Sequence, residues 1–187
     1  GSKFSLFNFN YINKNKIYSD LFFYNGGSGN LLIYEKIIKQ IIKENKGLKI
    51  VILIGPYAHN HQKVYEKFKN YKSIKIVYKI FNISNYLKGT KLFISSTGIS
   101  MFESSFIKLP TLLFKINENQ NLLDNDCEKL GHFFLLNKKD LKNTHKVTKL
   151  IFLMLKNINQ IKKMMSLSKI ELKNIKLNFK KHLKDLL

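Results

Sequence analysis

The sequence contains no arginine and no tryptophan, a single cysteine and only two prolines among its 187 residues. One cysteine, Cys127, excludes an internal disulfide and is too few for a cysteine-based zinc site. A lone thiol fits a reducing compartment, so we predict a cytoplasmic protein. The sequence also has no apolar run of transmembrane length and no evident signal peptide.

The charge of the chain is strongly one-sided. It has 33 basic residues, all of them lysines, against 12 acidic residues, and a formal net charge of +21. Such an excess on its face suggests a nucleic-acid or anionic-membrane partner. However, the chain has no arginine, the residue that binds phosphate and guanine through its planar guanidinium group. The joint abundance of Lys, Asn, Ile, Phe and Tyr also matches AT-rich codons, which explains the lysine excess without a binding role. We therefore expect no nucleic-acid partner, although the charge can concentrate anionic ligands such as nucleotides near the protein.

The first residues differ from the rest of the chain. Gly1-Ser2 is typical of residues left after tag removal, and residues 3–18 show no clear hydrophobic period. We interpret 1–19 as a tag scar and lead-in segment and expect the natural protein to extend upstream. Residues 20–187 then form one domain, because their length suits a single domain and no boundary is evident after residue 19.

Short apolar runs alternate with segments of helical period along most of the chain. The predicted strands are 20–24, 49–54, 74–78, 92–94, 111–114 and 133–136. The predicted helices are 30–45, 62–70, 82–88, 99–108, 119–130 and, as two helices, 140–187. Continuous apolar strands between helices are typical of a parallel sheet covered on both faces. The sequence therefore predicts an α/β fold, a Rossmann-like parallel sheet of about six strands.

Ligands of such sheets bind outside the carboxyl ends of the strands, so the loops that follow the strands are the candidate sites. The first candidate loop, residues 25–30, contains Gly26, Gly27 and Gly29 and opens a predicted helix. Glycines let backbone amides approach an anion closely, and the helix N-terminus adds a positive dipole. The alternative interpretation is an ordinary strand-to-helix turn.

The second candidate loop, residues 95–100, also joins a predicted strand to a helix, and its hydroxyls and amides can hold phosphate. Alternatively, its serines and threonine only cap the helix. Glu103 lies three residues after Ser100 and so on the same helix face. A carboxylate there can accept both hydroxyls of a ribose. Alternatively, it is a surface residue favoured by the helix dipole.

Two further loops are polar. Residues 117–121 carry a dense set of amide side chains ahead of a predicted helix, which also fits a plain polar loop. Residues 55–61 include His59 and His61, but no third ligand is evident, so we predict no metal site and no cofactor. No Ser-His-Asp arrangement and no convincing carboxylate pair is present, and we assign no catalytic residue.

In their order, these loops resemble the C-terminal domain of GT-B glycosyltransferases over roughly residues 20–136. The family of lipid II N-acetylglucosaminyltransferases has a glycine-rich first loop, a serine/glycine loop, a helix glutamate, and a Gln-Gln motif before a helix that ends Glu-Lys-x-Gly. The matching residues here are Gly26-Gly27-Ser28-Gly29, Ser96-Thr97-Gly98, Glu103, Asn119-Gln120 and Glu128-Lys129-Leu130-Gly131. A closer resemblance is to the UDP-sugar hydrolase family of pseudaminic acid biosynthesis, because that family has Asn-Gln in place of Gln-Gln.

The resemblance implies a nucleotide-sugar hydrolase half that binds UDP or a UDP-sugar, whose partner is a preceding GT-B domain that carries the catalytic histidine. It implies diphosphate binding by Gly27, Ser28, Gly29, Thr97, Gly98 and Ile99, ribose binding by Glu103, uracil binding near Phe81, and sugar binding by Asn119 and Gln120. Three alternatives remain: a glycosyltransferase donor-binding domain, a non-catalytic binding module, and a basic nucleic-acid-binding domain.

Overall fold

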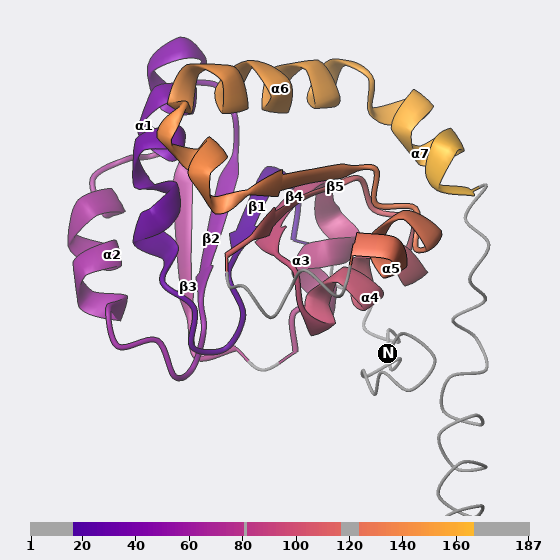
Figure 1. The fold of residues 1–187 in the computed structure, drawn as a ribbon. Coiled ribbons are helices and arrows are strands. Elements are labelled where there is room, and N and C mark those ends of the chain that lie inside the picture. Colours follow the sequence, from indigo (N-terminus) through magenta and orange to yellow (C-terminus); the bar gives the residue numbers. More distant parts are fainter. Residues whose placement is uncertain (1–16, 81, 117–123, 167–187) are drawn as a thin grey trace, which may run out of the picture.

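The computed structural model of the chain describes residues 17–80, 82–116 and 124–166. Within these residues, six parallel strands form one sheet in the order β3-β2-β1-β4-β5-β6 (Figure 1). The strands are β1 (Ser19–Tyr24), β2 (Ile50–Ile54), β3 (Ile74–Tyr78), β4 (Thr90–Ser96), β5 (Thr111–Lys115) and β6 (Phe134–Asn137). The predicted fold class is confirmed, and among the strands the largest difference is β4, which extends two residues beyond 92–94 at each end.

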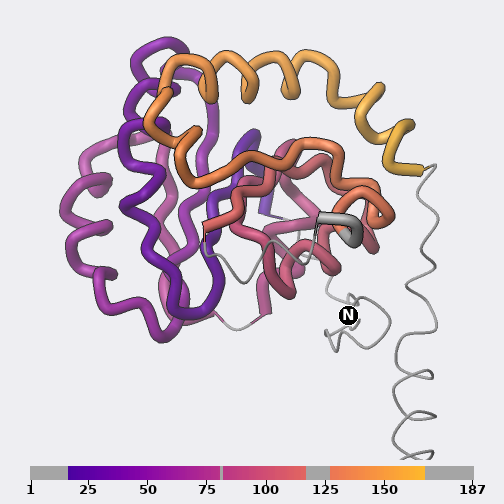
Figure 2. Tube along the Cα trace, in the orientation of Figure 1, coloured from indigo at the N-terminus to yellow at the C-terminus, as the bar shows by residue number. Residues whose placement is uncertain are grey.

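Helices cover both faces of this sheet. One face packs against the 3-10 helix η2 (Leu31–Tyr34), α1 (Glu35–Glu44), α2 (His61–Phe68), α6 (Thr144–Lys156) and α7 (Ile158–Ser166). The other face packs against α3 (Ser84–Gly89), α4 (Ile99–Phe106) and α5 (Asp124–Lys129). Figures 1 and 2 show α6 crossing back over the sheet beside α1, so the last described segment closes the first face. None of the described helices is long and apolar enough to cross a membrane.

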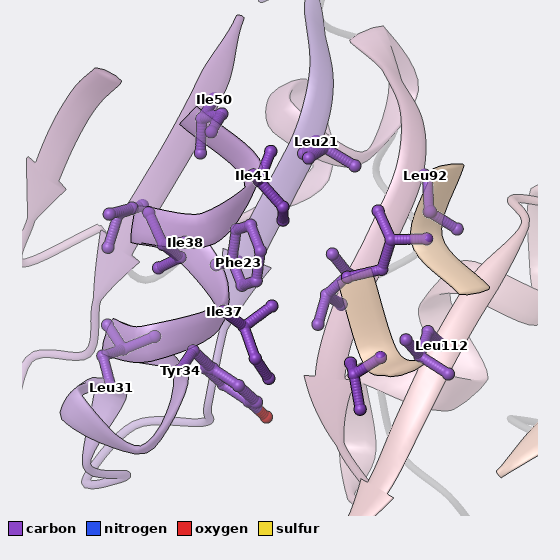
Figure 3. Packing of buried hydrophobic residues seen from close by; sticks show 14 of the residues in the cluster. Leu21, Phe23, Leu31, Tyr34, Ile37, Ile38, Ile41, Ile50, Leu92 and Leu112 are labelled. Carbon is purple, nitrogen blue, oxygen red and sulfur yellow. The ribbon is translucent and has the colours of Figure 1, made fainter. Parts of the chain in front are cut away.

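The apolar pattern of the sequence explains this arrangement. In α1, Ile37, Ile38 and Ile41 recur at helical spacing and are all buried against the sheet (Figure 3). In β1, alternate side chains enter opposite cores, so that Phe23 packs under α1 and Phe22 packs under α3. Both faces of the central strands are thus covered, which is why their middle residues, 21–23 in β1 and 92–94 in β4, are all apolar.

Several helix boundaries differ from the prediction. The helix predicted from residue 30 begins as η2, with Asn30 as its predicted cap: the Asn30 Oδ1 accepts from the Leu32 amide at 2.9 Å. The C-terminal helical region begins with a 3-10 helix, η4 (Lys138–Lys142), before α6. Within the predicted helix 119–130, residues 124–129 are helical. Residues 119–123 of that helix, and residues 167–187 of the predicted C-terminal helices, lie outside the described residues.

A tyrosine occupies the centre of the larger core. Tyr34 is fully buried and lies beside Phe23 (Figure 3). Its ring centroid lies 5.7 Å from that of Phe23 and 5.5 Å from that of Phe114. No hydrogen-bond partner for its hydroxyl is found among the described residues. The ring therefore stabilises the core by packing, while the buried hydroxyl costs free energy because it has left water without replacing its hydrogen bonds.

We expect Tyr34→Phe to raise the free energy of unfolding by about 1 kcal/mol, because the substitution removes the unpaired hydroxyl and keeps the ring. Urea denaturation followed by circular dichroism measures this change. Tyr65→Phe, at a tyrosine that is 52% exposed, is the matched control and should change stability by less than about 0.5 kcal/mol. A loss of stability in Tyr34→Phe would show that the hydroxyl is satisfied after all.

Candidate functional site

The strand order reverses at one position in the sheet: β2 and β3 lie on one side of β1, and β4, β5 and β6 lie on its other side. β1 pairs with β2 on one side and with β4 on the other, and Tyr24 at the end of β1 lies opposite Ser95 of β4. In open parallel sheets, ligands bind at this switch point, outside the carboxyl ends of the two central strands. Loops 25–30 and 95–100, the two candidate loops of the sequence, follow these two strands and therefore lie next to each other.

The backbone of loop 25–30 is held in one shape. Gly26 has a φ of 76°, in the left-handed region that favours glycine. A Cβ on Gly29 would lie 1.6 Å from the carbonyl oxygen of Asn25, so no side chain fits at this position. The Asn25 side chain is buried and donates from Nδ2 to the Asn30 carbonyl at 3.1 Å, which closes the loop. Gly29 is thus required by the loop itself, independently of any ligand.

The loop after β2, residues 55–61, supports the glycine-rich loop. A Cβ on Gly55 would lie 2.2 Å from the carbonyl oxygen of Gly27, so the two loops pass in direct backbone contact. The Tyr57 amide donates to the same oxygen at 2.9 Å, and the Asn60 side chain donates to the Asn30 Oδ1. No sequence prediction covers this supporting role. A glycine directly after a buried strand was the signal of its supporting role.

The histidines of this loop are not gathered for metal binding. The ring of His61 stacks on Tyr78, with centroids 4.6 Å apart and an interplanar angle of 11°, and its Nδ1 lies 3.3 Å from the Ala58 carbonyl oxygen. Across the described parts of the chain, no three His, Cys, Asp or Glu side chains come together as a metal site. His61 therefore packs α2 onto β3.

The second candidate loop leads into α4. Gly98 is the N-cap of this helix, and no side chain caps it, contrary to the interpretation in which serine or threonine does so. Ser100 instead lies 3.2 Å from Ser95, between their buried Oγ atoms, and the Thr97 amide donates to the Phe114 carbonyl at 3.1 Å. The amides of the first turn of α4 are thus left without a side-chain acceptor, next to the glycine-rich loop.

Buried polar contacts from the segment before β6 fix the orientation of α4. The Nε2 of His132 lies 2.7 Å from the Met101 carbonyl oxygen, and the Ser105 hydroxyl donates to the Leu130 carbonyl at 2.6 Å. Burial lowers the pKa of His132 to about 4, so the ring is neutral at pH 7 and Nε2–H is the donor to Met101. Since the helix is held on this side, the position of Glu103 on its other side is set by packing.

Glu103 is not a solvated surface residue. Burial raises the pKa of its carboxyl group to about 7, because the charged form loses water without gaining a compensating partner. No ion pair or hydrogen bond to this carboxylate is found among the described residues. Burial raises the pKa of the Tyr24 hydroxyl, and the charge of Glu103 raises it further. A half-buried carboxylate without a partner is therefore available at the switch point.

The structure brings together most of the residues implied by the resemblance. Loop 25–30 contributes Gly27, Ser28 and Gly29, and the start of α4 contributes Thr97, Gly98, Ile99 and Glu103. Phe81, Asn119 and Gln120 lie outside the described residues. The ligand-binding roles of all ten residues stay predictions. Tyr24, the last residue of β1, was not predicted as a site residue, because an aromatic residue at the end of a buried strand has the sequence pattern of a core residue.

Comparison with known proteins gives one relative in sequence and several in structure. No family model matches the chain. The uncharacterized protein MJ1062 of Methanocaldococcus jannaschii is 26% identical over 110 residues, which are 57% of this chain and 23% of the relative. In structure, a putative UDP-N-acetylglucosamine 2-epimerase from Listeria monocytogenes matches with a TM-score of 0.62 and 13% identity, over 89% of this chain and 46% of the other.

Two further similar structures were solved with UDP. A variant of S. aureus TarM, in a complex that includes UDP, matches with a TM-score of 0.60 and 13% identity, over 90% of this chain and 36% of TarM. Arabidopsis thaliana UGT89C1 complexed with UDP matches with a TM-score of 0.59 and 11% identity, over 91% of this chain and 44% of UGT89C1.

These likenesses confirm the fold and its similarity to GT-B chains. They give no support to the narrower resemblance to the hydrolase of pseudaminic acid biosynthesis. The chain spans less than half the length of each solved structure.

The two glycines of the neighbouring loops should respond differently to alanine. Gly29→Ala places a Cβ 1.6 Å from a backbone oxygen, so we expect a loss of about 2 kcal/mol in the free energy of unfolding. Gly98 is the matched control, because its φ of 167° is ordinary extended backbone and a Cβ there meets nothing within 4 Å. Gly98→Ala should change stability by less than about 0.5 kcal/mol in the same urea titration. Equal losses in both variants would contradict the described loop shape.

The buried carboxylate predicts a pH dependence of stability. An acid with a pKa of about 7 in the folded chain and 4.5 when unfolded binds more protons in the folded state between these pH values. The free energy of unfolding therefore falls as the pH rises from 4.5 to 7. The glutamine in Glu103→Gln does not titrate. The free energy of unfolding of this variant should therefore exceed that of the unmutated chain by a difference that grows across this window and reaches up to about 3 kcal/mol at pH 8.

This pH dependence is measured as the difference between the two proteins in urea titrations from pH 4 to 8. The titration of His132 occurs in both proteins and cancels in that difference. Parallel stability curves for the two proteins would mean that Glu103 is fully solvated.

Proposed function

We propose that this chain binds a UDP-sugar at the switch point of the sheet and is the donor-binding half of a GT-B type glycosyltransferase. The observation that carries the proposal is the meeting of three features at one edge: a glycine loop of fixed shape, a helix N-terminus without a side-chain cap, and an unpaired carboxylate one turn further along that helix.

Each feature suits a different part of a nucleoside diphosphate. Backbone amides and the positive end of α4 attract the diphosphate. The Glu103 carboxylate accepts hydrogen bonds from the ribose hydroxyls, and such charge-assisted bonds are stronger than neutral ones. The net charge of +21 raises the local concentration of the anionic ligand, although it gives no specificity.

Of the transferase and hydrolase roles, the transferase role has the better support. Two of the similar structures, those of TarM and UGT89C1, were solved with UDP, and another, that of pneumococcal GtfA with UDP and GlcNAc, is named an O-GlcNAc transferase. The hydrolase interpretation depends on the pair Asn119-Gln120, which lies outside the described residues. It is therefore the second candidate, with the same ligand and a different reaction.

The proposed activity needs a second half. The chain spans 36% to 46% of the similar structures, and no Ser-His-Asp arrangement or carboxylate pair is evident in its sequence. We propose that the acceptor site and the catalytic groups belong to a preceding GT-B domain that closes over the switch point. This chain would then hold and orient the nucleotide of the donor.

We expect the chain to bind UDP more tightly than ADP or CMP in titration calorimetry at pH 8, where Glu103 is charged. Glu103→Ala should weaken UDP binding by roughly 10- to 100-fold, because it removes about 1.5–3 kcal/mol of charge-assisted hydrogen bonding. Glu103→Gln keeps one acceptor oxygen and should lose less.

Glu44→Ala is the control, because Glu44 is exposed at the C-terminal end of α1, at the opposite edge of the sheet. It should bind UDP as the unmutated chain does. Equal affinity for the three nucleotides, or an unchanged affinity in Glu103→Ala, would remove the basis for a UDP-sugar ligand.

A further inference from the structure

The residue that ends β1 lies beside the proposed nucleotide site but was not among the predicted site residues. Tyr24 is half-buried, and its ring stacks on Phe22 with a centroid distance of 6.4 Å and an interplanar angle of 7°. Both side chains therefore lie on the face of the sheet that α3 and α4 cover. Tyr24 also lies directly before loop 25–30, the loop proposed to hold the diphosphate.

The register of the sheet places this tyrosine under the first turn of α4. Tyr24 is the parallel partner of Ser95, and partners in register point to the same face. Ser95 contacts Ser100 on α4, with 3.2 Å between the two Oγ atoms. Glu103 lies three residues after Ser100 on the same face of the helix. Tyr24 on β1 and Glu103 on α4 therefore lie on the same face of the sheet, near the carboxyl ends of β1 and β4.

The two side chains offer complementary chemistry to a ligand. Neither the Tyr24 hydroxyl nor the Glu103 carboxylate has a hydrogen-bond partner in the described part of the chain. Their proximity is also evident from the pKa of Tyr24, which the charge of Glu103 raises. A phenol donates one hydrogen bond, and a carboxylate only accepts. A group that fits between them must accept from one and donate to the other, as an alcohol does.

We propose that Tyr24 is a specificity-determining residue of this site, whose hydroxyl donates to a ribose hydroxyl that in turn donates to Glu103. The proposal rests on the proposed function, because it assigns the ligand to the class of ribonucleoside diphosphates. It adds a selection that Glu103 alone makes less sharply: a deoxyribose that lacks this alcohol leaves the Tyr24 hydroxyl unpaired and Glu103 with one donor fewer.

The test compares UDP with 2′-deoxy-UDP and 3′-deoxy-UDP by titration calorimetry at pH 8. We expect Tyr24→Phe to bind UDP roughly 3- to 10-fold more weakly, the value of one neutral hydrogen bond. It should bind one of the two deoxy ligands as tightly as the unmutated chain does, because that ligand has no hydroxyl for Tyr24 to reach. The phenylalanine keeps the stacking on Phe22, and melting temperatures confirm that both proteins are folded.

Tyr86→Phe is the matched control. Tyr86 stacks on the same ring, with centroids 5.7 Å apart, and burial alone raises the pKa of its hydroxyl. It should leave the affinities for all three nucleotides unchanged.

The possible outcomes separate the two proposals. If the unmutated chain binds UDP and Tyr24→Phe binds it equally well, the role of Tyr24 is overturned and the proposed function stands. Equal weakening of all three nucleotides by Tyr24→Phe also overturns it, since Tyr24 then acts only through packing. If the unmutated chain binds no UDP, the proposed function fails and the role of Tyr24 fails with it.

Discussion

The pairing of β1 with both β2 and β4 is the constraint on which the rest of this structure depends. Because β1 is central, the loop that follows it is flanked by the ends of two other strands. The loop after β2 supports it through Gly55 and Tyr57, and α4 begins beside it after β4. An edge strand would have left the same glycine loop with support on one side only. The site is thus a consequence of strand order.

Burial of a carboxylate gives the site its chemical character. Glu103 lies on a helix whose other contacts are apolar or neutral, and His132 and Ser105 hold that helix in place. The folded chain therefore carries a carboxyl group whose charged form is poorly solvated, at a cost in stability. Such costs are frequent at functional sites, where a ligand supplies the missing partner. The hydrogen bonds of a ribose would offset the cost in this protein.

The fold could be predicted well from the sequence because its signals are local. The isoleucines of α1 recur at helical spacing, and the strands are short apolar runs, three of which are closed by Gly, Pro or Ser. Both signals arise from burial, which repeats with the period of the element. The helix boundaries near residues 31 and 138 were predicted less well, since 3-10 and α-helices share a similar apolar pattern.

The sequence by itself determined the fold class, the two loops at the strand ends and the candidate role of Glu103. Only the tertiary structure decided that those loops are neighbours, that Gly55 supports the first of them, and that Tyr24 pairs in register with Ser95, next to the start of α4. These facts depend on strand order and register, and no local pattern encodes which strands pair. The burial of Glu103 has the same origin. The local sequence is the same whether a helical glutamate is buried or solvated, and only the elements that the fold packs around it decide which.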